Sequence, residues 1–271
     1  MTGGTGFIGG HFIRLAQEKG HDVVALRRPG SRNRIKLRTE PTWYEAELND
    51  VNDEVLSSCD ALFHFAAQGV SPQKTDWLTA FHVNVMQSLG LMHQADRLSI
   101  SHVICCGSCF EYGLSGERYD KIPVDAPLEP IGPYAASKAA FSVALTALAH
   151  SSKKSWTLLR PFHLYGSGQD QANFWPSMRK AALAGQDFLM TSGEQIRDYM
   201  AVEDAAQKFL DILIIQGQQS DLIVRNIGSG DPVTMQKFAE KWWLFWQASG
   251  RLKIGELPYR EGETMRFVPE L

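Results

Sequence analysis

The sequence predicts an α/β fold, in which a doubly wound parallel sheet is followed by a smaller C-terminal lobe. Three observations support this fold class: short apolar segments alternate with helical patterns, a glycine-rich loop opens the chain, and the alternation changes after residue 160. Continuously apolar strands are typical of sheets buried on both faces, and strand–helix alternation produces parallel pairing. With 271 residues, 44% of them hydrophobic, the chain can bury such a core.

The expected elements of the first part follow from these patterns. Strands are expected at residues 21–26, 61–65, 102–106 and 156–160, and helices at residues 8–19, 76–98 and 133–150. Only Met1 and Thr2 precede the glycine loop, where a full strand is usual, so we expect a chain that is trimmed at its ends or whose start was placed late. Residues 27–41, rich in Arg, Gly and Pro, are expected to form a mobile loop.

The second part is expected to form the smaller lobe. Helices are predicted at residues 174–184, 203–215 and 235–247, and a strand at residues 223–227. We therefore divide the chain into a first domain at residues 1–165 and a lobe at residues 166–271, partly interleaved with the first. Trp242, Trp243 and Trp246 recur at helical spacing, which indicates packing in a core or an interface.

Composition and charge exclude several classes of protein. The chain has 27 Lys and Arg against 30 Asp and Glu, a net charge of -3, and no long basic run. This balance argues against nucleic acid or an acidic membrane as a partner. No apolar segment is long enough to cross a bilayer and no signal-peptide pattern opens the chain, so a cytoplasmic protein is expected.

Three of the four cysteines lie close together, and Cys106 and Cys109 form a C-x-x-C pattern. The pattern indicates either a redox or metal-binding pair or small apolar residues that close a buried strand. Since no second C-x-x-C or His pair completes a metal site, packing is the favoured interpretation and no metal is expected.

A glycine-rich loop, Gly3-Gly-Thr-Gly6-Phe-Ile-Gly9, leads directly into the first expected helix. Glycine allows positive φ angles and a close approach of the backbone, and the N-terminus of a helix favours a phosphate. Because an expected strand follows within one βαβ length, the loop indicates a Rossmann-type dinucleotide site. Gly3, Gly6, Phe7, Ile8 and Gly9 are therefore candidate cofactor contacts.

The residues after the strand at 21–26 bear on the choice of dinucleotide. An acidic residue there binds the ribose of NAD, whereas Arg accommodates the 2′-phosphate of NADP. The sequence has Arg27 and Arg28 at this point and no Asp or Glu. Arg pairs bidentately with phosphate, so NADPH is the favoured cofactor and NAD is the alternative. The plainest interpretation of these two arginines is a solvated basic loop with no part in binding.

A tyrosine and a lysine four residues apart, Tyr134 and Lys138, share one face at the start of an expected helix. A nearby ammonium lowers the pKa of a tyrosine from about 10 towards neutral and makes it an acid–base group. Ser108 follows the strand at 102–106, at the carboxyl end of the sheet where ligands bind, and could orient a substrate oxygen. Together with the glycine loop, these residues indicate a nicotinamide-dependent oxidoreductase.

In this order, the motifs resemble the extended short-chain dehydrogenases/reductases, the NAD(P)-dependent nucleotide-sugar epimerase/dehydratase family. The resemblance covers nearly the whole chain and is carried by residues 3–9, 65–67, 108–113, 134–138, 160–166 and 197–199. It implies a catalytic trio of Ser108, Tyr134 and Lys138, with Lys138 also holding the nicotinamide ribose. It further implies a nucleotide-sugar substrate and often a homodimer built on a helix bundle.

The resemblance assigns further contacts. Those expected on the cofactor are Glu47, Ala66 and Pro161. Those expected on the substrate are Asn84, His163, Asn173, Arg197 and Arg260. Five of these positions have a plainer alternative. It is a surface charge for Glu47, a satisfied buried amide for Asn84, a hydrogen-bonded wall residue for His163, and a structural ion pair for each of Arg197 and Arg260.

Two residues depart from the sugar dehydratases of this family, which carry an Asp-Glu pair after the catalytic Ser or Thr. Here Cys109 and Phe110 stand at those positions, so the carboxylates that would drive water elimination are absent. Residues 107–113 and 162–165 instead resemble 4-ketoreductases that act on nucleotide-linked 4-keto-6-deoxy sugars.

Three functions are therefore weighed. The first is reduction of a keto group, at C4, of a nucleotide-linked deoxy sugar by NADPH, in which Tyr134 protonates the oxygen that Ser108 holds. The alternative is a nucleotide-sugar 4-epimerase with tightly bound NAD. The third is a non-catalytic nucleotide-binding sensor, against which the intact trio argues.

Overall fold

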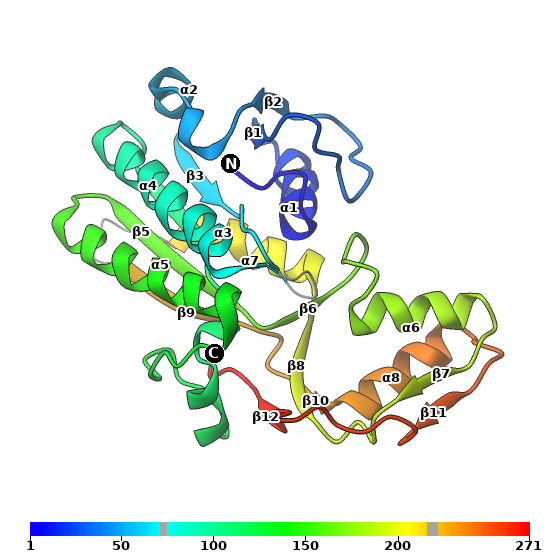
Figure 1. Cartoon of the computed structure of the whole chain (residues 1–271). Coiled ribbons are helices and arrows are strands. Elements are labelled where there is room, and N and C mark those ends of the chain that lie inside the picture. The colour runs from blue at the N-terminus through cyan, green and yellow to red at the C-terminus, as the bar shows by residue number, and fades with distance from the viewer. Residues whose placement is uncertain (71–74, 216–221) are drawn as a thin grey trace.

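The computed structural model describes residues 1–70, 75–215 and 222–271 (Figure 1). The helices are α1 (Phe7–Glu18), α2 (Asp53–Ser57), α3 (Trp77–Phe81), α4 (Ser88–Arg97), α5 (Gly132–Ser151), α6 (Phe174–Leu183), α7 (Val202–Ile215) and α8 (Met235–Phe245). The strands are β1 (Val24–Arg27), β2 (Thr42–Glu45), β3 (Ala61–His64), β4 (His102–Cys106), β5 (Ser155–Pro161), β6 (His163–Tyr165), β7 (Phe188–Met190), β8 (Ile196–Ala201), β9 (Leu222–Ile227), β10 (Pro232–Thr234), β11 (Leu252–Ile254) and β12 (Arg266–Phe267). Short helical turns are η1 (Leu48–Asp50), the π-helix η2 (His82–Gln87), η3 (Cys109–Glu111) and η4 (Leu114–Arg118).

The first domain is built on parallel strands. The order β3-β4-β5-β9 forms one sheet, and β1 pairs with β2 in parallel beside it. Two residues join these pieces: the amide of Leu26 donates to Met1 O at 2.8 Å, and the amide of Thr2 donates to Phe63 O at 2.9 Å. Met1 and Thr2 thus fill the place of the strand that leads into the glycine loop.

Helices cover both faces of this sheet, with α3, α4 and α5 on one side and α1 and α7 on the other (Figure 1). The side chains of β4 show why. Val103 and Cys105 pack in the same cluster as residues of α4 and α5, whereas Ile104 and Cys106 pack with residues of α1 and α7. A strand whose alternate side chains are all apolar has to be covered on both faces, so the predicted doubly wound fold is confirmed.

The C-terminal lobe has its own small core. Helices α6 and α8 pack with the parallel pair β7–β11 around buried Met178, Met190 and Trp243. The predicted packing role of the tryptophans is confirmed, because Trp242 and Trp246 also border this cluster. Strands β6, β10 and β12 pair with β8 and connect the lobe to the sheet.

The chain enters the C-terminal lobe after β6, returns to the first domain for α7 and β9, and then enters the lobe again. Helix α7 and strand β9 come after residue 166 in the sequence, yet they complete the layers of the first domain. The division at residues 165 and 166 stays a prediction, with this interleaving included.

Several predicted boundaries were wrong. The strand expected from residue 21 begins at Val24, since residues 21 and 22 are exposed outside it. The helix expected at 76–98 is three segments, α3, η2 and α4, and Asp76 caps the first by accepting from the amide of Thr79. Helix α8 ends at Phe245, and Gln247 beyond it has φ 52°. Strands of two to six residues, β2, β6, β7, β8, β10, β11 and β12, were not predicted.

Within the described ranges, no helix is both long and apolar enough to span a membrane.

Candidate active site

A cavity of about 430 Å³ lies between the carboxyl ends of β4 and β5 and the C-terminal lobe. It brings together nine of the predicted site residues: Phe7, Ile8, Ser108, Tyr134, Lys138, Pro161, His163, Asn173 and Arg197. Because open parallel sheets bind ligands at the carboxyl ends of their strands, this is where a site is expected.

The glycine loop at one end of the cavity is folded too tightly for side chains. Gly3 has φ +68°, and a Cβ on it would lie 2.7 Å from the amide nitrogen of Ala66. A Cβ on Gly9 would lie 2.2 Å from Gly3 O, and the amide of Gly6 donates to that same oxygen at 2.9 Å. The loop ends at the N-terminus of α1, whose first residues Phe7 and Ile8 line the cavity. This arrangement fits a dinucleotide pyrophosphate.

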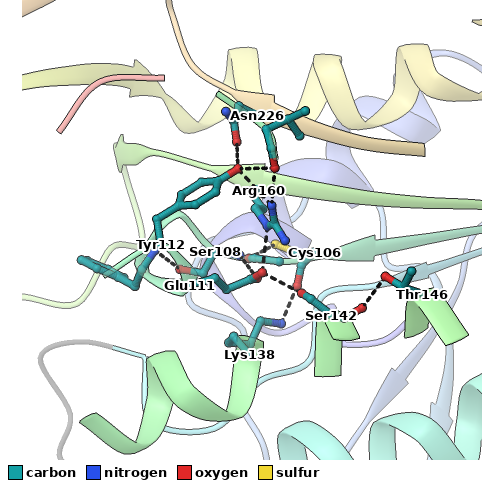
Figure 2. A network of polar contacts seen from close by, with 12 residues as sticks. Cys106, Ser108, Glu111, Tyr112, Lys138, Ser142, Thr146, Arg160 and Asn226 are labelled. Carbon is teal, nitrogen blue, oxygen red and sulfur yellow. Dashed lines mark hydrogen bonds and ion pairs between the residues drawn. The ribbon is translucent and has the colours of Figure 1, made fainter. Parts of the chain in front are cut away.

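The three predicted catalytic side chains meet at the end of β4. Ser108 caps the turn η3, and its hydroxyl accepts from the amide of Phe110 at 3.3 Å and hydrogen-bonds the Tyr134 hydroxyl. Helix α5 begins just before Tyr134, where Pro133 in the first turn presets the helical φ angle. The ammonium of Lys138 donates to Cys106 O on β4 (Figure 2). We call these three residues the sheet wall.

The predicted lowering of the Tyr134 pKa was wrong for this geometry. Burial raises the pKa of Tyr134 above its ordinary value, Cys106 adds to the rise, and the hydrogen bond from Ser108 opposes it. The Lys138 ammonium is directed to the Cys106 carbonyl instead of the phenol. Tyr134 is therefore held as a neutral phenol, the form that donates a proton.

The opposite side of the cavity comes from β6 and β8 and carries His163, Arg197 and Tyr199, which we call the lobe wall. The rings of His163 and Tyr199 are 5.9 Å apart, and Phe110 lies edge-on to His163 at 6.4 Å. The buried Nδ1 of His163 has no hydrogen-bond partner among the described residues. Burial, and then Arg197, lower the pKa of His163 to about 3, so the ring is neutral at ordinary pH.

Arg197 reaches the cavity but is held by its own chain. Its guanidinium donates to Ile196 O at 3.0 Å and to Thr264 O at 2.5 Å, and it lies 3.3 Å from a carboxylate oxygen of Glu263. Burial lowers its pKa. A cation fixed in this way suits recognition of an anionic ligand.

Other predicted site residues lie outside the described lining of this cavity. The amide of Asn84 donates to Gln68 O and to Ser137 Oγ, both at 2.9 Å, and its oxygen accepts from the amide of Gln68 at 2.7 Å. This pattern matches the satisfied buried amide, since both N–H donors and the oxygen of Asn84 are bonded within the protein and the side chain is buried. Arg28, Glu47 and Arg260 are exposed.

The arginine expected to select the cofactor has a carboxylate beside it. Nε of Arg27 lies 3.1 Å from Glu45 Oε1, and its guanidinium sits 5.1 Å from the Trp43 ring centroid. Glu45 was missed because β2 was not predicted, although the register pairs it directly with Arg27. Arg34 also reaches the cavity.

The clustered cysteines are buried and free, as the packing interpretation predicts. Burial raises the pKa of the Cys106 thiol to about 11 and that of Cys105 to about 12, so both stay protonated. Among the described residues, no group of three or more His, Cys, Asp or Glu could hold a metal ion.

The fold and the sheet wall define a class, that of dinucleotide-binding enzymes with a Ser-Tyr-Lys site. A family model for the NAD dependent epimerase/dehydratase family matches residues 1–228. The chain belongs to this family, and it is an enzyme of the NAD-dependent epimerase/dehydratase type.

Individual relatives agree with the family. A UDP-glucose 4-epimerase of Corynebacterium glutamicum is 25% identical over 260 residues, which cover 89% of this chain and 78% of that protein. The solved structure of MoeE5 in complex with UDP-glucose and NAD is 26% identical, with a TM-score of 0.81 over 100% of this chain and 88% of that one. A UDP-N-acetylglucosamine 4-epimerase from Methanobrevibacter ruminantium M1 shares the fold with a TM-score of 0.87 at 24% identity, over 100% and 88% of the two chains.

These relatives correct one part of the predicted resemblance. The epimerase/dehydratase family is confirmed, whereas the finer likeness to keto-sugar reductases is not supported by the relatives, which are mostly UDP-glucose 4-epimerases.

Proposed function

We propose that this enzyme interconverts the C4 epimers of a nucleotide-linked hexose and keeps NAD bound throughout turnover. The observation that carries the proposal is the meeting of Ser108, Tyr134 and Lys138 at one wall of a cavity that also borders the glycine loop. The names of the relatives, UDP-glucose 4-epimerases among them, favour this reaction over net reduction.

The glycine loop, with no room for a Cβ on Gly3 or Gly9, fits the pyrophosphate of the dinucleotide. Bound NAD supplies the acceptor, and later the donor, of the hydride at C4 of the sugar. We assign the ribose of the bound NAD to Lys138, whose ammonium is buried beside β4.

Proton transfer falls to Tyr134. In the oxidising half, the phenolate form of Tyr134 takes the proton of the C4 hydroxyl and becomes a phenol, and the hydrogen bond from Ser108 stabilises the phenolate from which this step starts. In the reducing half, the phenol returns this proton to the C4 oxygen. The raised pKa of Tyr134 keeps it in the phenol form that the reducing half uses, so formation of the phenolate is the step that the site has to assist.

Elimination of water is not part of the proposal. Cys109 and Phe110 follow Ser108 at the cavity, and burial raises the pKa of the Cys109 thiol well above its usual range. Neither side chain can act as the acid or base that such a step needs.

The direct test is incubation of purified protein with UDP-glucose without added cofactor. Formation of UDP-galactose, together with release of NAD from the denatured protein in about equal amount, is the expected result. Absence of product with NAD present would overturn epimerisation of this sugar.

A second candidate is reduction of a nucleotide-linked keto sugar by NADPH, the function first predicted. Arg28, exposed at the end of β1, and Arg34 at the cavity favour it, since both could meet a 2′-phosphate. Stoichiometric loss of NADPH absorbance with a 4-keto-6-deoxy nucleotide sugar would support this reaction. Binding of nucleotide without turnover in either assay would favour the sensor.

The expected homodimer and cytoplasmic location remain predictions. Exposed apolar side chains on the α3 and α5 side of the sheet, including Leu78 and Val143, support a dimer through these helices.

A further inference from the structure

A buried carboxylate, Glu111, lies directly behind the sheet wall. It is fully buried at the end of η3 and has no contact with the cavity in the described structure. Its two carboxylate oxygens accept hydrogen bonds from three elements: the η3 turn that Ser108 caps, helix α5, which carries Tyr134 and Lys138, and strand β5 (Figure 2).

The first contact fixes the serine. Glu111 Oε1 accepts from the backbone amide of Ser108 at 2.7 Å, which closes the η3 turn as a capping box. The second oxygen fixes the helix: Oε2 accepts from the hydroxyl of Ser142 on α5 at 2.6 Å. Ser142 stands one helical turn after Lys138 and two after Tyr134, so a single carboxylate connects the serine to the helix of the Tyr–Lys pair.

The third contact supplies the countercharge. Nε of Arg160 on β5 donates to the same Oε2 at 2.8 Å, and both side chains of this pair are almost completely buried. Nη1 of Arg160 donates to the Tyr112 hydroxyl and to Val124 O, each at 3.0 Å. Tyr112 in turn donates to Asn226 Oδ1 on β9 at 2.7 Å. The network is therefore also attached to β9, the edge strand that pairs with β5.

We propose that Glu111 is a positioning residue, which sets the placement of the Ser108 hydroxyl against Tyr134 by joining the η3 turn to α5, with Arg160 as its buried counterion. This inference rests on the proposed proton transfer by Tyr134. From the sequence alone, Glu111 would be taken for a surface charge. Burying its carboxylate between three elements costs desolvation free energy, and an apolar residue would pack there without that cost.

Two double variants separate positioning from charge balance. Glu111→Gln with Arg160→Met removes both charges but keeps an oxygen for the Ser108 amide and an NH₂ for Ser142. Glu111→Leu with Arg160→Met removes the same charges and both of these hydrogen bonds. Replacement of both partners avoids an uncompensated buried charge, so each double variant is expected to fold. The Leu/Met variant should melt at a somewhat lower temperature, because the buried Ser108 amide and Ser142 hydroxyl lose their partner.

The activity readout is the epimerisation of UDP-glucose by the holoenzyme. The Leu/Met variant should have a kcat about 30-fold below that of the Gln/Met variant, with KM within about threefold, because misplaced groups slow the chemistry more than they weaken binding. Glu129→Gln, which removes a carboxylate from the exposed ion pair with Arg118, is the matched control and should retain the parental kcat. Equal kcat values for the two double variants would overturn the proposal.

A second readout needs no substrate. In protein labelled with [¹³Cζ]tyrosine, the Tyr134 resonance, assigned with Tyr134→Phe, reports its ionisation. The titratable or charged groups that act on Tyr134 or line its cavity are Arg34, Cys106, Cys109, Glu111, Lys138, His163, Tyr165, Asp170, Arg197, Tyr199 and Glu263. Both double variants lose the same charges, so their difference isolates the bond from Ser108, which lowers the Tyr134 pKa.

The Leu/Met variant should therefore show less phenolate at pH 11 than the Gln/Met variant. If UDP-glucose is not turned over but this difference is present, the proposed function fails while the positioning role stands. Coincident titrations would overturn the positioning role whatever the activity.

Discussion

The sheet wall and the lobe wall face the same cavity but differ in how their polar atoms are used. On the sheet wall, Ser108 and Lys138 are bonded to neighbours within the first domain. On the lobe wall, His163 leaves a buried ring nitrogen without a partner among the described residues, within a set of aromatic rings. A wall whose groups are fixed internally suits a reaction that demands exact placement, and a wall with hydrogen-bonding capacity in reserve suits recognition of a ligand.

The substitution Tyr134→Phe is the strongest test of this difference between the two walls. If the sheet wall carries the chemistry, kcat for UDP-glucose should fall about 1000-fold, the range typical for loss of a general acid–base, with little change in KM. Tyr119→Phe, outside the described lining of the cavity, is the matched control. A Tyr134→Phe enzyme that retains a tenth of the parental kcat would move proton transfer to another group.

The next largest effect concerns the glycine loop at one end of the cavity. In Gly9→Ala, a Cβ would lie 2.2 Å from Gly3 O, so the loop has to open. We expect NAD affinity to fall about 100-fold, as an overpacking cost of about 3 kcal/mol gives, measured by titration of NAD into protein stripped of nucleotide. Gly90→Ala on α4, where the nearest atom to a new Cβ is 3.9 Å away, should bind as the parent does. Normal NAD affinity in Gly9→Ala would disprove the assignment of this loop.

The lobe wall is tested by His163→Leu. Loss of one hydrogen bond to substrate should raise KM for the nucleotide sugar about tenfold, while kcat changes much less. His163→Gln retains a hydrogen-bonding side chain and serves as the comparison. If kcat falls in His163→Leu as far as it does in Tyr134→Phe, the division of labour between the walls is wrong.

Lowering the pH should reduce the stability of both regions, because each contains a buried neutral histidine. Burial, followed by Lys138 and the chain N-terminus, lowers the pKa of His64, behind the sheet wall, to about 3, as burial and Arg197 do for His163. Since both values are below the unfolded pKa of about 6.5, the unfolded state binds more protons between these limits. Stability is complete above pH 6.5 and should fall by about 1.4 kcal/mol per pH unit for each histidine as the pH drops towards 3.

Chemical denaturation at a series of pH values measures this slope. His64→Gln, which can still bond Thr2 and Ser88, should show about half of the histidine contribution. The same slope in variant and parent would mean that His64 does not remain neutral in the fold.

The smallest expected effect is on the choice between NADP and NAD near Arg27. Glu45→Gln removes the carboxylate beside Arg27, so the guanidinium becomes available to a 2′-phosphate. Exposed pairs contribute at most about 1 kcal/mol, and the preference for NADP over NAD should therefore rise about threefold in competitive binding. A shift towards NAD would show that Glu45 does not restrain Arg27.

The two walls also differ in how much of them could be predicted. Residues 102–106 were assigned to β4 without error, because buried parallel strands are continuously apolar, and Ser108 and Tyr134 follow from motifs adjacent to regular elements. Strand β8 mixes Arg197, Asp198 and Tyr199 with apolar residues, and its pairing with β6, β10 and β12 depends on segments distant in sequence. No local pattern indicates such a strand.

Buried polar residues were the main source of error. In the sequence, Glu111 and Asn84 are indistinguishable from exposed or ligand-binding residues, since burial of a polar group depends on partners such as Arg160 and Gln68 that the fold brings near. The predicted lowering of the Tyr134 pKa was wrong for the same reason. The spacing places Lys138 on the same helix face as Tyr134, but a backbone carbonyl of β4 determines where the Lys138 ammonium lies.

The aromatic core of the C-terminal lobe gives the protein an uneven distribution of chromophores. Four of its seven tryptophans, Trp175, Trp242, Trp243 and Trp246, lie in one cluster of the lobe, and Trp175 and Trp242 have ring centroids 5.5 Å apart. In the sheet, Trp156 is fully buried. Intrinsic fluorescence and near-ultraviolet circular dichroism will therefore weight the lobe more heavily than backbone dichroism does, although Trp43, Trp77 and Trp156 of the first domain also contribute. Unfolding curves from the two signals, recorded on the unlabelled protein, will separate the melting of the lobe from that of the sheet.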